Sequence, residues 1–396
     1  MSSSPVAPAP DASVDAAARP SLTVLYGFWS GATQAVARAL VAADPSVTLI
    51  RHGPNATADR LRDDVLPSLA RLAGSRPARD VVLVLPEEAD PETVCAASTH
   101  CLVGGVPLSD LVRVRSHVTV VDAEHLLDGL GTDDDLVALG IQAGDHDCRA
   151  VADVVVRQIE CADALVLWQS RADPLATAQA QALLHRLAPW VPCLPVARDR
   201  IDAAGLVRHL RHSGHRPQVP GVLARGLEGY PLGVHEPQPR CDIVSAVFRA
   251  RRPFHPQRLY DTLETLQDGV LRSRGHLWLA SQPDTVVAWD FTASGLTLGT
   301  LGRWLAAVPD DCWDLASDDR RLAAAFDWDP YYEDRHQHLV FIGLDLDAAD
   351  LQRTLSGCLL TDTELADGAT AWRDYPDPFA GRFPAPDLRT DGNAAT

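Results

Sequence analysis

Three histidines at helical spacing form one set of potential metal ligands in the chain. His209, His212 and His215 make a His-x-x-His-x-x-His run, and imidazole nitrogen is a common ligand of Zn²⁺. On a helix these positions span about 120°, which is wide for three ligands of one ion. Gly214 also weakens a helix there. The run is therefore a weak metal-site candidate, and a solvated linker is the interpretation that its composition favours.

Arginine is the only basic side chain in the sequence besides histidine. All 35 residues counted as Lys+Arg are arginine, and the chain has no lysine. Between residues 241 and 280 six arginines face four acidic residues: Arg249, Arg251, Arg252, Arg258, Arg272 and Arg274. They could form a surface for an anionic partner, either rRNA phosphate or an acidic protein. Alternatively they pair with the chain's own carboxylates and stack on its aromatic rings. The second interpretation fits the acidic chain better.

Bulk composition excludes several classes of function. A net charge of −18 repels nucleic-acid phosphate, so we predict no DNA partner. No apolar run is long enough to cross a bilayer, and the first twenty residues lack the features of a signal peptide. The eight cysteines form no Cys-x-x-Cys pair, and no Ser-His-Asp spacing is recognisable. We therefore predict a cytoplasmic protein with free thiols and no identifiable catalytic residue.

The secondary-structure elements that position these residues follow two different sequence patterns in the two halves of the chain. From residue 22 to about 200, apolar runs such as Val81–Leu85 alternate with helical patterns such as Val151–Ile159. This alternation predicts a doubly wound parallel sheet. From residue 241, strand patterns such as Ile243–Ala250 and Leu339–Leu344 surround helices opening at Pro256 and Ala348. That pattern predicts a smaller α+β domain, with an antiparallel meander and helices on one face.

These patterns give predicted boundaries for the whole chain. We expect a leader over 1–20 and an α/β domain over 21–205. A Gly/Pro/His-rich linker follows over 206–240, an α+β domain over 241–380 and a polar tail over 381–396.

Five segments of the second half resemble the C-terminal domain of the CobW family: Phe248–Leu259, Gly269–Gly275, Trp278–Ala280, Val340–Gly343 and Leu359–Asp362. In the first half, Leu22–Thr33 resembles the strand and phosphate loop of the same family. The resemblance implies a P-loop NTPase-like domain followed by the CobW C-terminal domain. CobW-type proteins are GTPases that handle metals, several of them in zinc or cobalt supply.

The phosphate loop departs from the family at the residues that do the chemistry. The family's loop ends in Gly-Lys-Thr, and the corresponding residues here are Ala32, Thr33 and Gln34, while Gly27 and Gly31 remain. We assign these five positions as a vestigial nucleotide site. The ammonium that grips the phosphates and the hydroxyl that holds Mg²⁺ are both missing, and each contributes strongly to binding and to transition-state stabilisation.

Two further GTPase elements of the family are replaced. Trp168-Gln-Ser-Arg171 stands where the family reads guanine with Asn-Lys-x-Asp, and residues 55–59 lack the family's Cys-x-Cys-Cys metal motif. GTP hydrolysis is therefore not expected, and no GTP, Mg²⁺ or zinc requirement is certain.

The resemblance is strongest to an actinobacterial branch described as ribosome hibernation factor-recruiting GTPases, made under zinc limitation. It implies a protein that binds a protein partner, such as the ribosome or a hibernation factor. Two alternatives stay open: a GTP-dependent zinc metallochaperone with residual GTPase activity, and a sensor of another small anion.

Overall fold

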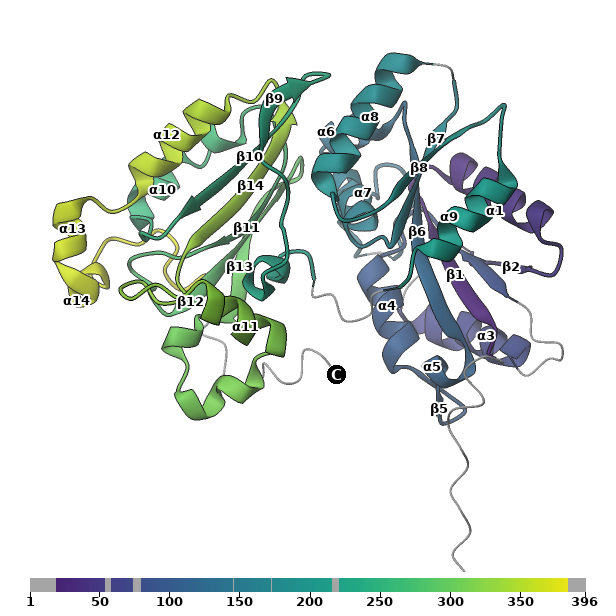
Figure 1. Cartoon of the computed structure of the whole chain (residues 1–396), viewed down its shortest axis with the longest axis horizontal. Helices are drawn as coiled ribbons and strands as arrows, with labels where there is room; N and C mark the ends of the chain where they lie inside the picture. The colour runs from purple at the N-terminus through teal and green to yellow at the C-terminus, as the bar shows by residue number, and fades with distance from the viewer. Residues whose placement is uncertain are drawn as a thin grey trace, which may run out of the picture.

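The structure of the protein is a computed structural model that describes residues 19–53, 58–73, 80–144, 146–171, 173–215 and 221–383. Two domains lie side by side (Figure 1). Most of the predicted leader, 1–20, and of the predicted tail, 381–396, lies outside the described residues. None of the helices in the described part of the chain is long and apolar enough to cross a bilayer.

The first domain is built on a six-stranded parallel sheet in the order β2-β3-β1-β6-β7-β8. Its strands are β1 (Ser21–Tyr26), β2 (Thr48–Arg51), β3 (Val81–Val84), β6 (Arg113–Asp122), β7 (Ala164–Gln169) and β8 (Cys193–Ala197). Every residue of β1 and β3 is buried, as continuous apolar runs require when helices cover both faces of a sheet. A short antiparallel pair, β4 (Leu102–Val103) and β5 (Val106–Pro107), lies outside this sheet.

Helices cover both faces of this parallel sheet. They are α1 (Ser30–Ala43), α2 (Ala58–Arg60), the π-helical turn η1 (Leu61–Val65), α3 (Leu66–Ala73), α4 (Pro91–His100), α5 (Leu108–Leu111), α6 (Leu126–Gly131), α7 (Val151–Glu160), α8 (Pro174–Leu187) and α9 (Ala203–His212). Helices α1 and α9 pack on one face, with Val36 and Leu206 in the same core cluster. Helices α3, α4, α7 and α8 cover the other face.

The second domain holds a six-stranded antiparallel sheet in the order β13-β12-β11-β14-β10-β9. Its strands are β9 (Glu236–Arg240), β10 (Ile243–Ala250), β11 (Val270–Leu277), β12 (Thr285–Thr292), β13 (Gly295–Arg303) and β14 (Gln337–Leu344). Strands β11, β12 and β13 form the predicted meander. The fold class, a doubly wound parallel sheet followed by an α+β domain, is confirmed.

The helical segments of the second domain are mostly short. They are η2 (Ala224–Glu228), α10 (Pro256–Thr262), η3 (Thr265–Gln267), η4 (Leu305–Ala307), η5 (Asp310–Leu315), α11 (Asp318–Phe326), α12 (Ala348–Cys358), α13 (Asp362–Ala366) and α14 (Gly368–Trp372). Helices α10 and α12 pack on one sheet face through Leu259, Leu351 and Leu355. Helix α11 lies in a lobe at one end of the domain (Figure 1).

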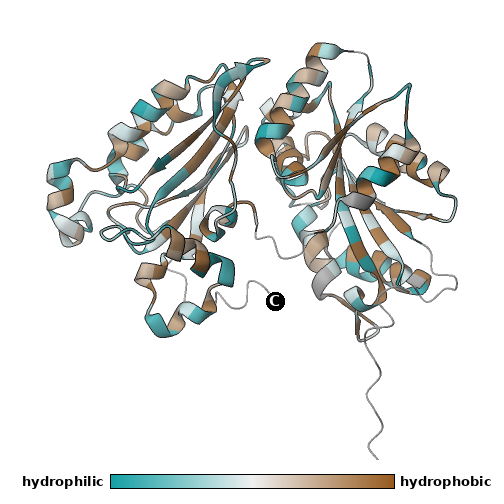
Figure 2. Ribbon diagram, in the orientation of Figure 1, coloured by the Kyte–Doolittle hydropathy of each residue, from teal (hydrophilic) through white to brown (hydrophobic). Residues whose placement is uncertain are grey.

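The opposite face of the second sheet packs against the first domain. Ile243, Val340 and Ile342 belong to the same core cluster as Val155 of α7 and Leu183 of α8. Both faces of β10 and β14 are therefore apolar over much of their length, and Figure 2 shows hydrophobic stretches in the strands of both sheets. Burial of this shared apolar surface is what holds the two domains together.

The segment expected to be linker, 206–240, contains regular structure at both ends. Most of α9 belongs to the first domain and packs on α1 and β6, while β9 is the edge strand of the second sheet. The connection between the domains is therefore shorter than the composition suggested.

Candidate functional site

The segment that corresponds to the phosphate loop is a short turn. Strand β1 ends at Tyr26 and α1 begins at Ser30, so only Gly27, Phe28 and Trp29 connect them. In a phosphate loop the helix begins near the G-K-[ST] end of the G-x-x-x-x-G-K-[ST] pattern, whereas α1 begins at Ser30, two residues before Ala32. Here Gly31, Ala32, Thr33 and Gln34 already lie in α1. The predicted nucleotide positions are adjacent in space, but four of the five are helical residues.

Thr33 closes this turn from the inside. Its side chain is 1% exposed, and its hydroxyl donates to the carbonyl oxygens of Gly27 (3.4 Å) and Trp29 (3.3 Å). The amides of Ala32 and Thr33 both donate to the Trp29 carbonyl. A Cβ atom on Gly27 would lie 2.1 Å from the Thr33 hydroxyl, so the two residues are in direct contact. These groups are committed to one another and not to a phosphate.

Gln34 and the aromatic residues around the vestigial site also make contacts within the protein. Gln34 accepts a hydrogen bond from the Arg51 guanidinium (2.9 Å) and offers no hydroxyl to Mg²⁺. The Trp29 ring packs on Gly129 of α6, and Phe28 meets Trp29 edge to face. Trp168, at the position of the guanine reader, is 5% exposed in the core. This geometry favours an aromatic-filled turn over a nucleotide cradle.

Arg272 and Arg274 lie in the interior, which is a correction to their prediction as partner-binding surface residues. Arg274 is fully buried and Arg272 is 2% exposed. Both guanidinium groups contact the carboxylate of Glu160 at the end of α7. Arg274 also donates to the Leu232 carbonyl. An ion pair of this kind joins two domains and is out of reach of any partner.

The other predicted arginines are nearer the surface and have partners within the chain. Arg251 pairs with Asp327 (2.6 Å), and Arg252 pairs with Asp362 (2.5 Å). Arg258 makes a two-pronged contact with Glu364, at 2.7 and 2.8 Å. Internal pairing therefore accounts for these three. Arg249 differs, because its guanidinium donates to Nε2 of His338 (3.1 Å).

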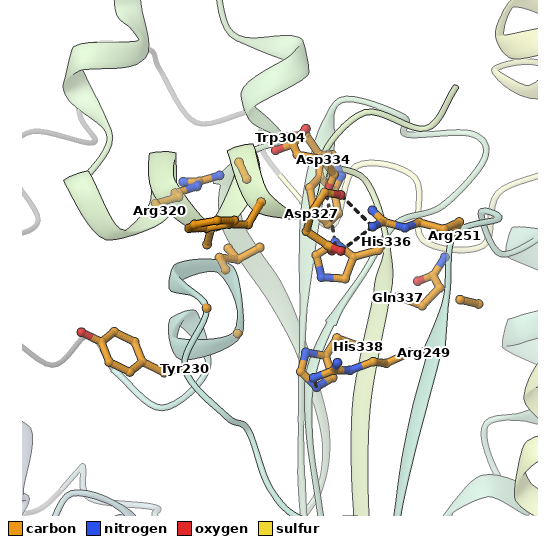
Figure 3. A pocket seen from close by; sticks show the side chains of 17 residues that line it. Tyr230, Arg249, Arg251, Trp304, Arg320, Asp327, Asp334, His336, Gln337 and His338 are labelled. Atoms are coloured by element: carbon orange, nitrogen blue, oxygen red, sulfur yellow. Dashed lines mark hydrogen bonds and ion pairs between the residues drawn. The ribbon is translucent and has the colours of Figure 1, made fainter. Parts of the chain in front are cut away.

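A cluster of three histidines lies beside Arg249, and two of them, His336 and His338, line a cavity of about 510 Å³ (Figure 3). His276 on β11 and His338 on β14 are paired residues of neighbouring strands, and His336 immediately precedes β14. Their ligand atoms all lie within 4.8 Å of one another, and Nε2 of His276 lies 3.0 Å from Nε2 of His336. Asp334 lies close by, where its carboxylate accepts from the amides of Leu305 and Ala306.

The spacing of His336 and His338, two residues apart in the sequence, predicts that they share an exposed strand face, and for His338 this prediction is wrong. His338 is only 4% exposed, and His276 was not recognised as their neighbour. The available signal was a histidine in each of two strands whose residues are almost all buried, Val270–Leu277 and Gln337–Leu344, because a buried polar side chain requires a partner.

The chemistry of this cluster is that of neutral imidazoles. Burial lowers the pKa of His338 to about 3, with the nearby Arg249 and His336 adding to the effect. Burial also lowers the pKa values of His276 and His336. Neutral imidazoles can coordinate a divalent metal, and the His336 Nδ1 contact with the Asp334 carbonyl (2.9 Å) would orient that ring. The Arg249 guanidinium, however, repels a cation at this position.

The histidine run at 209–215 is divided between a helix and the segment that follows it. His209 and His212 lie in α9, whereas His215 follows the helix, and nothing is described for the side chain of His212. His215 instead lies beside His117 of β6, with ring centroids 4.8 Å apart, and beside Cys95 of α4. The sequence pattern did not indicate either neighbour, because both are distant along the chain.

A parallel α/β domain packed on an antiparallel α+β domain defines the class of this protein, and comparisons of sequence define its family. Residues 243–359 match the family model described as the cobalamin synthesis protein cobW C-terminal domain. The zinc chaperone Rv0106 of Mycobacterium tuberculosis is 34% identical over 325 residues, which is 81% of this chain and 76% of that relative. The chain belongs to the CobW family.

Two further relatives are more distant. The zinc-regulated GTPase metalloprotein activator 1 of Dictyostelium discoideum is 28% identical over 334 residues, covering 81% of this chain and 67% of that protein. The crystal structure of Zn(II)-bound YjiA GTPase from E. coli superimposes with a TM-score of 0.35 at 15% identity, over 86% of this chain and 99% of that one.

Proposed function

We propose that this CobW-family protein acts in a zinc-linked response by binding a protein partner, without GTP hydrolysis. Two lines of support are independent of each other. Relatives of the chain carry the names zinc chaperone and zinc-regulated GTPase metalloprotein activator, which supports the link to zinc. The closed turn at Gly27–Trp29 supports the loss of hydrolysis, and this observation carries the proposal.

The turn argues against hydrolysis on two physical grounds. Phosphoryl transfer is catalysed almost entirely by positioning and by stabilisation of negative charge, which lysine, Mg²⁺ and loop amides supply. The chain has no lysine, and the described residues of the turn direct Thr33 and two helix amides at their own carbonyl groups. A phosphate group arriving there would have to displace these internal bonds.

A partner surface is offered by the α11 lobe, which we define as residues 310–331. It exposes five large apolar side chains within a short stretch: Leu315, Leu322, Phe326, Trp328 and Tyr331. Phe326, at the end of α11, is 85% exposed. Exposed apolar clusters rimmed by polar residues are typical of protein interfaces, and aromatic residues are enriched among those that dominate binding.

The charge of the same lobe favours a basic partner. It contains seven acidic residues against Arg320 and Arg321. Such a surface repels RNA phosphate and attracts a basic protein. Complementary charge of this kind raises the rate of association with a basic partner and disfavours binding of acidic ones. We therefore place the partner-binding function on this lobe instead of on the arginines, and a basic protein of the ribosome or a hibernation factor is the partner that the proposal names.

The absence of hydrolysis is tested by titrating nucleotide-free protein with GTP, with and without Mg²⁺, and by measuring phosphate release. We expect no Mg²⁺-dependent binding at micromolar GTP and no turnover. Thr33→Ala provides the check for contamination, since a contaminating enzyme is insensitive to it. Turnover at the rate of an intact family member, lost in Thr33→Ala, would overturn this half of the proposal.

The partner surface is tested by sedimenting ribosomes from zinc-depleted cells with the wild-type protein and with Phe326→Ser. The matched control is Leu175→Ser, which alters a 62% exposed apolar residue at the start of α8 in the first domain. We expect co-sedimentation of wild type and Leu175→Ser and loss with Phe326→Ser. Absence of the wild-type protein from ribosome and hibernation-factor fractions would exclude this partner.

The alternative is a GTP-dependent zinc metallochaperone, which the names of the relatives favour. It requires the opposite result in the first experiment, namely Mg²⁺-dependent GTP binding in the micromolar range coupled to zinc transfer.

A further inference from the structure

A second cluster of metal-ligating side chains lies in the first domain, away from the turn at Gly27. Cys95 comes from α4, His117 from β6 and His215 from the segment after α9. Their ligand atoms all lie within 4.8 Å of one another. The three residues line a cavity of about 440 Å³. Three segments that are distant in sequence therefore bring one thiol and two imidazoles to the same point.

Each imidazole of this cluster is held by an outer partner. Nδ1 of His117 lies 2.7 Å from the Tyr26 hydroxyl, and Nδ1 of His215 lies 2.9 Å from Oδ2 of Asp163. Asp163 Oδ2 also accepts from the backbone amide of His117 (2.7 Å), which ties both histidines to one carboxylate. Histidines that bind metals are oriented in this way through their second nitrogen.

The other nitrogen of His117 points to a missing ligand. His117 is 3% exposed, and its Nε2 atom is buried without a hydrogen-bond partner among the described residues. Buried polar atoms are nearly always hydrogen-bonded or coordinate a metal, and an orphaned one requires an explanation. A metal ion held between His117, His215 and Cys95 supplies one.

We propose that Cys95, His117 and His215 bind a single Zn²⁺ ion, with a fourth position open to the 440 Å³ cavity. One thiolate and two imidazoles are a zinc donor set, and three protein ligands with an open position are the arrangement of sites that bind a further ligand or exchange their metal. Solvent water fills the fourth position in the absence of another ligand.

Electrostatics favour this cluster over the histidines at 276, 336 and 338. Zinc at Cys95 gains the charge of the thiolate and lies one imidazole away from the Asp163 carboxylate. Zinc at the other cluster would face the Arg249 guanidinium, which lies 3.1 Å from His338. The repulsion between like charges is several times larger in a partly buried site than in water. Zinc should therefore bind at Cys95 in preference to the cluster beside Arg249.

Zinc binding at this site is coupled to the protonation of its ligands. Burial disfavours the charged form of His215, but its hydrogen bonds to Asp163 and Cys95 outweigh burial and raise its pKa to about 9. Burial, with a contribution from His215, lowers the pKa of His117 to about 4. Zn²⁺ binds a thiolate and neutral imidazoles, so its binding at pH 7 competes with the proton on His215, while His117 is already neutral. The other ionisable groups around the cavity are Tyr26, Glu92, Glu160, Cys161, Asp163 and Arg225.

The site gives the proposed zinc link a location, and to that extent it rests on the proposed function. Residues 213–215, Gly221, Val222 and Arg225 of the connection between the domains line the same cavity. A metal bound by His215 therefore fastens this connection to α4 and β6. Zinc binding itself is measurable without GTP or a partner, so failure of one proposal leaves the other standing.

The test is titration of the metal-free full-length protein with Co²⁺ and with Zn²⁺ against a chromophoric chelator. We expect a thiolate-to-cobalt charge-transfer band and the intense d–d bands of tetrahedral Co²⁺, both displaced by Zn²⁺. Cys95→Ser should abolish the charge-transfer band, and His215→Gln should weaken zinc binding by more than the roughly 10–100-fold typical for loss of an outer partner. Cys161→Ser is the matched control, because this thiol lines the same cavity without joining the cluster.

Chemical protection keeps the test valid if a variant fails to fold. In the wild-type protein we expect Zn²⁺ to slow alkylation of Cys95 by iodoacetamide, with the exposed Cys148 as the internal reference in the same digest. His338→Gln should leave both the cobalt spectrum and the protection unchanged. A charge-transfer band that survives in Cys95→Ser, or alkylation of Cys95 that is indifferent to zinc, would refute the site.

Discussion

Glu160, the last residue of α7, and Arg272, on β11, form a buried ion pair that crosses between the two domains. Arg272 Nε lies 2.8 Å from Glu160 Oε1, and its Nη2 lies 3.1 Å from Oε2. The same carboxylate contacts Arg274, and Arg272 also contacts Asp290. Two carboxylates thus balance two guanidinium groups inside the protein. The domains are joined by a charge network as well as by the apolar core around Ile342.

Glu160→Gln should strongly destabilise the protein. The substitution leaves Arg272 and Arg274 buried near the single carboxylate of Asp290, and removing one partner of a buried pair costs about 3–5 kcal/mol of unfolding free energy. Urea unfolding followed by tryptophan fluorescence measures this loss.

Glu364→Gln is the control for that measurement, because Glu364 pairs with Arg258 at a site where both side chains are partly exposed. Exposed or partly exposed pairs contribute about 1 kcal/mol or less. Equal losses in the two variants would contradict a special role for the pair between the domains.

The elements of this fold could be predicted from sequence because each depends on local pattern. The continuous run at Val81 gave a buried strand, and the alternation at Ile243–Ala250 gave β10 with the observed bounds. Strand β8 was missed because Cys193–Ala197 is short and contains Pro195. Helix α1 begins at Ser30, before the residues that correspond to the end of the family's phosphate loop, and this early start closes the turn.

The sites could be predicted only in part. The loss of the phosphate-loop residues is visible in the sequence, since an absent lysine cannot be supplied from elsewhere in the chain. The pairing of His276 with His338 depends on the register of two strands, and the approach of His215 to Cys95 depends on tertiary packing. No spacing along the chain encodes either contact, so both are visible only in the folded structure.

The closed turn predicts opposite effects for two glycines. Gly27→Ala should lower stability by roughly 1–3 kcal/mol, because the added Cβ meets the Thr33 hydroxyl at 2.1 Å and the Val120 carbonyl at 2.7 Å. Gly31→Ala should raise stability by up to about 1 kcal/mol, since nothing lies within 4 Å of its added Cβ and the residue is helical. Thermal unfolding compares the two. Gly27→Ala without loss of stability would contradict the closed turn.

The buried histidines predict sensitivity to acid. The pKa of His338 is about 3 in the folded protein and about 6.5 when unfolded, so its neutral form stabilises the fold above pH 6.5. That contribution is lost as pH falls toward 3, at up to about 1.4 kcal/mol per pH unit. His338→Gln keeps a hydrogen-bond acceptor for Arg249 and should reduce the fall in unfolding free energy between pH 6.5 and 3, as measured by urea unfolding. The other ionisable groups that face His338 are Arg249, His276 and His336. If the fall in unfolding free energy is unchanged in His338→Gln, it arises from these groups and not from His338.

His215 predicts the opposite dependence on pH in the metal-free protein. Its pKa is raised to about 9, so the charged imidazole beside Asp163 stabilises the fold fully below the unfolded pKa of about 6.5. That stabilisation is lost as pH rises from 6.5 through 9. Urea unfolding in the presence of a chelator should therefore show an alkaline decline, which His215→Gln removes and which substitution of the exposed His185 leaves in place. Saturating Zn²⁺ should remove the same decline in the wild-type protein, because the metal takes the position of the proton. An alkaline decline that zinc does not alter would place the ion somewhere other than on His215.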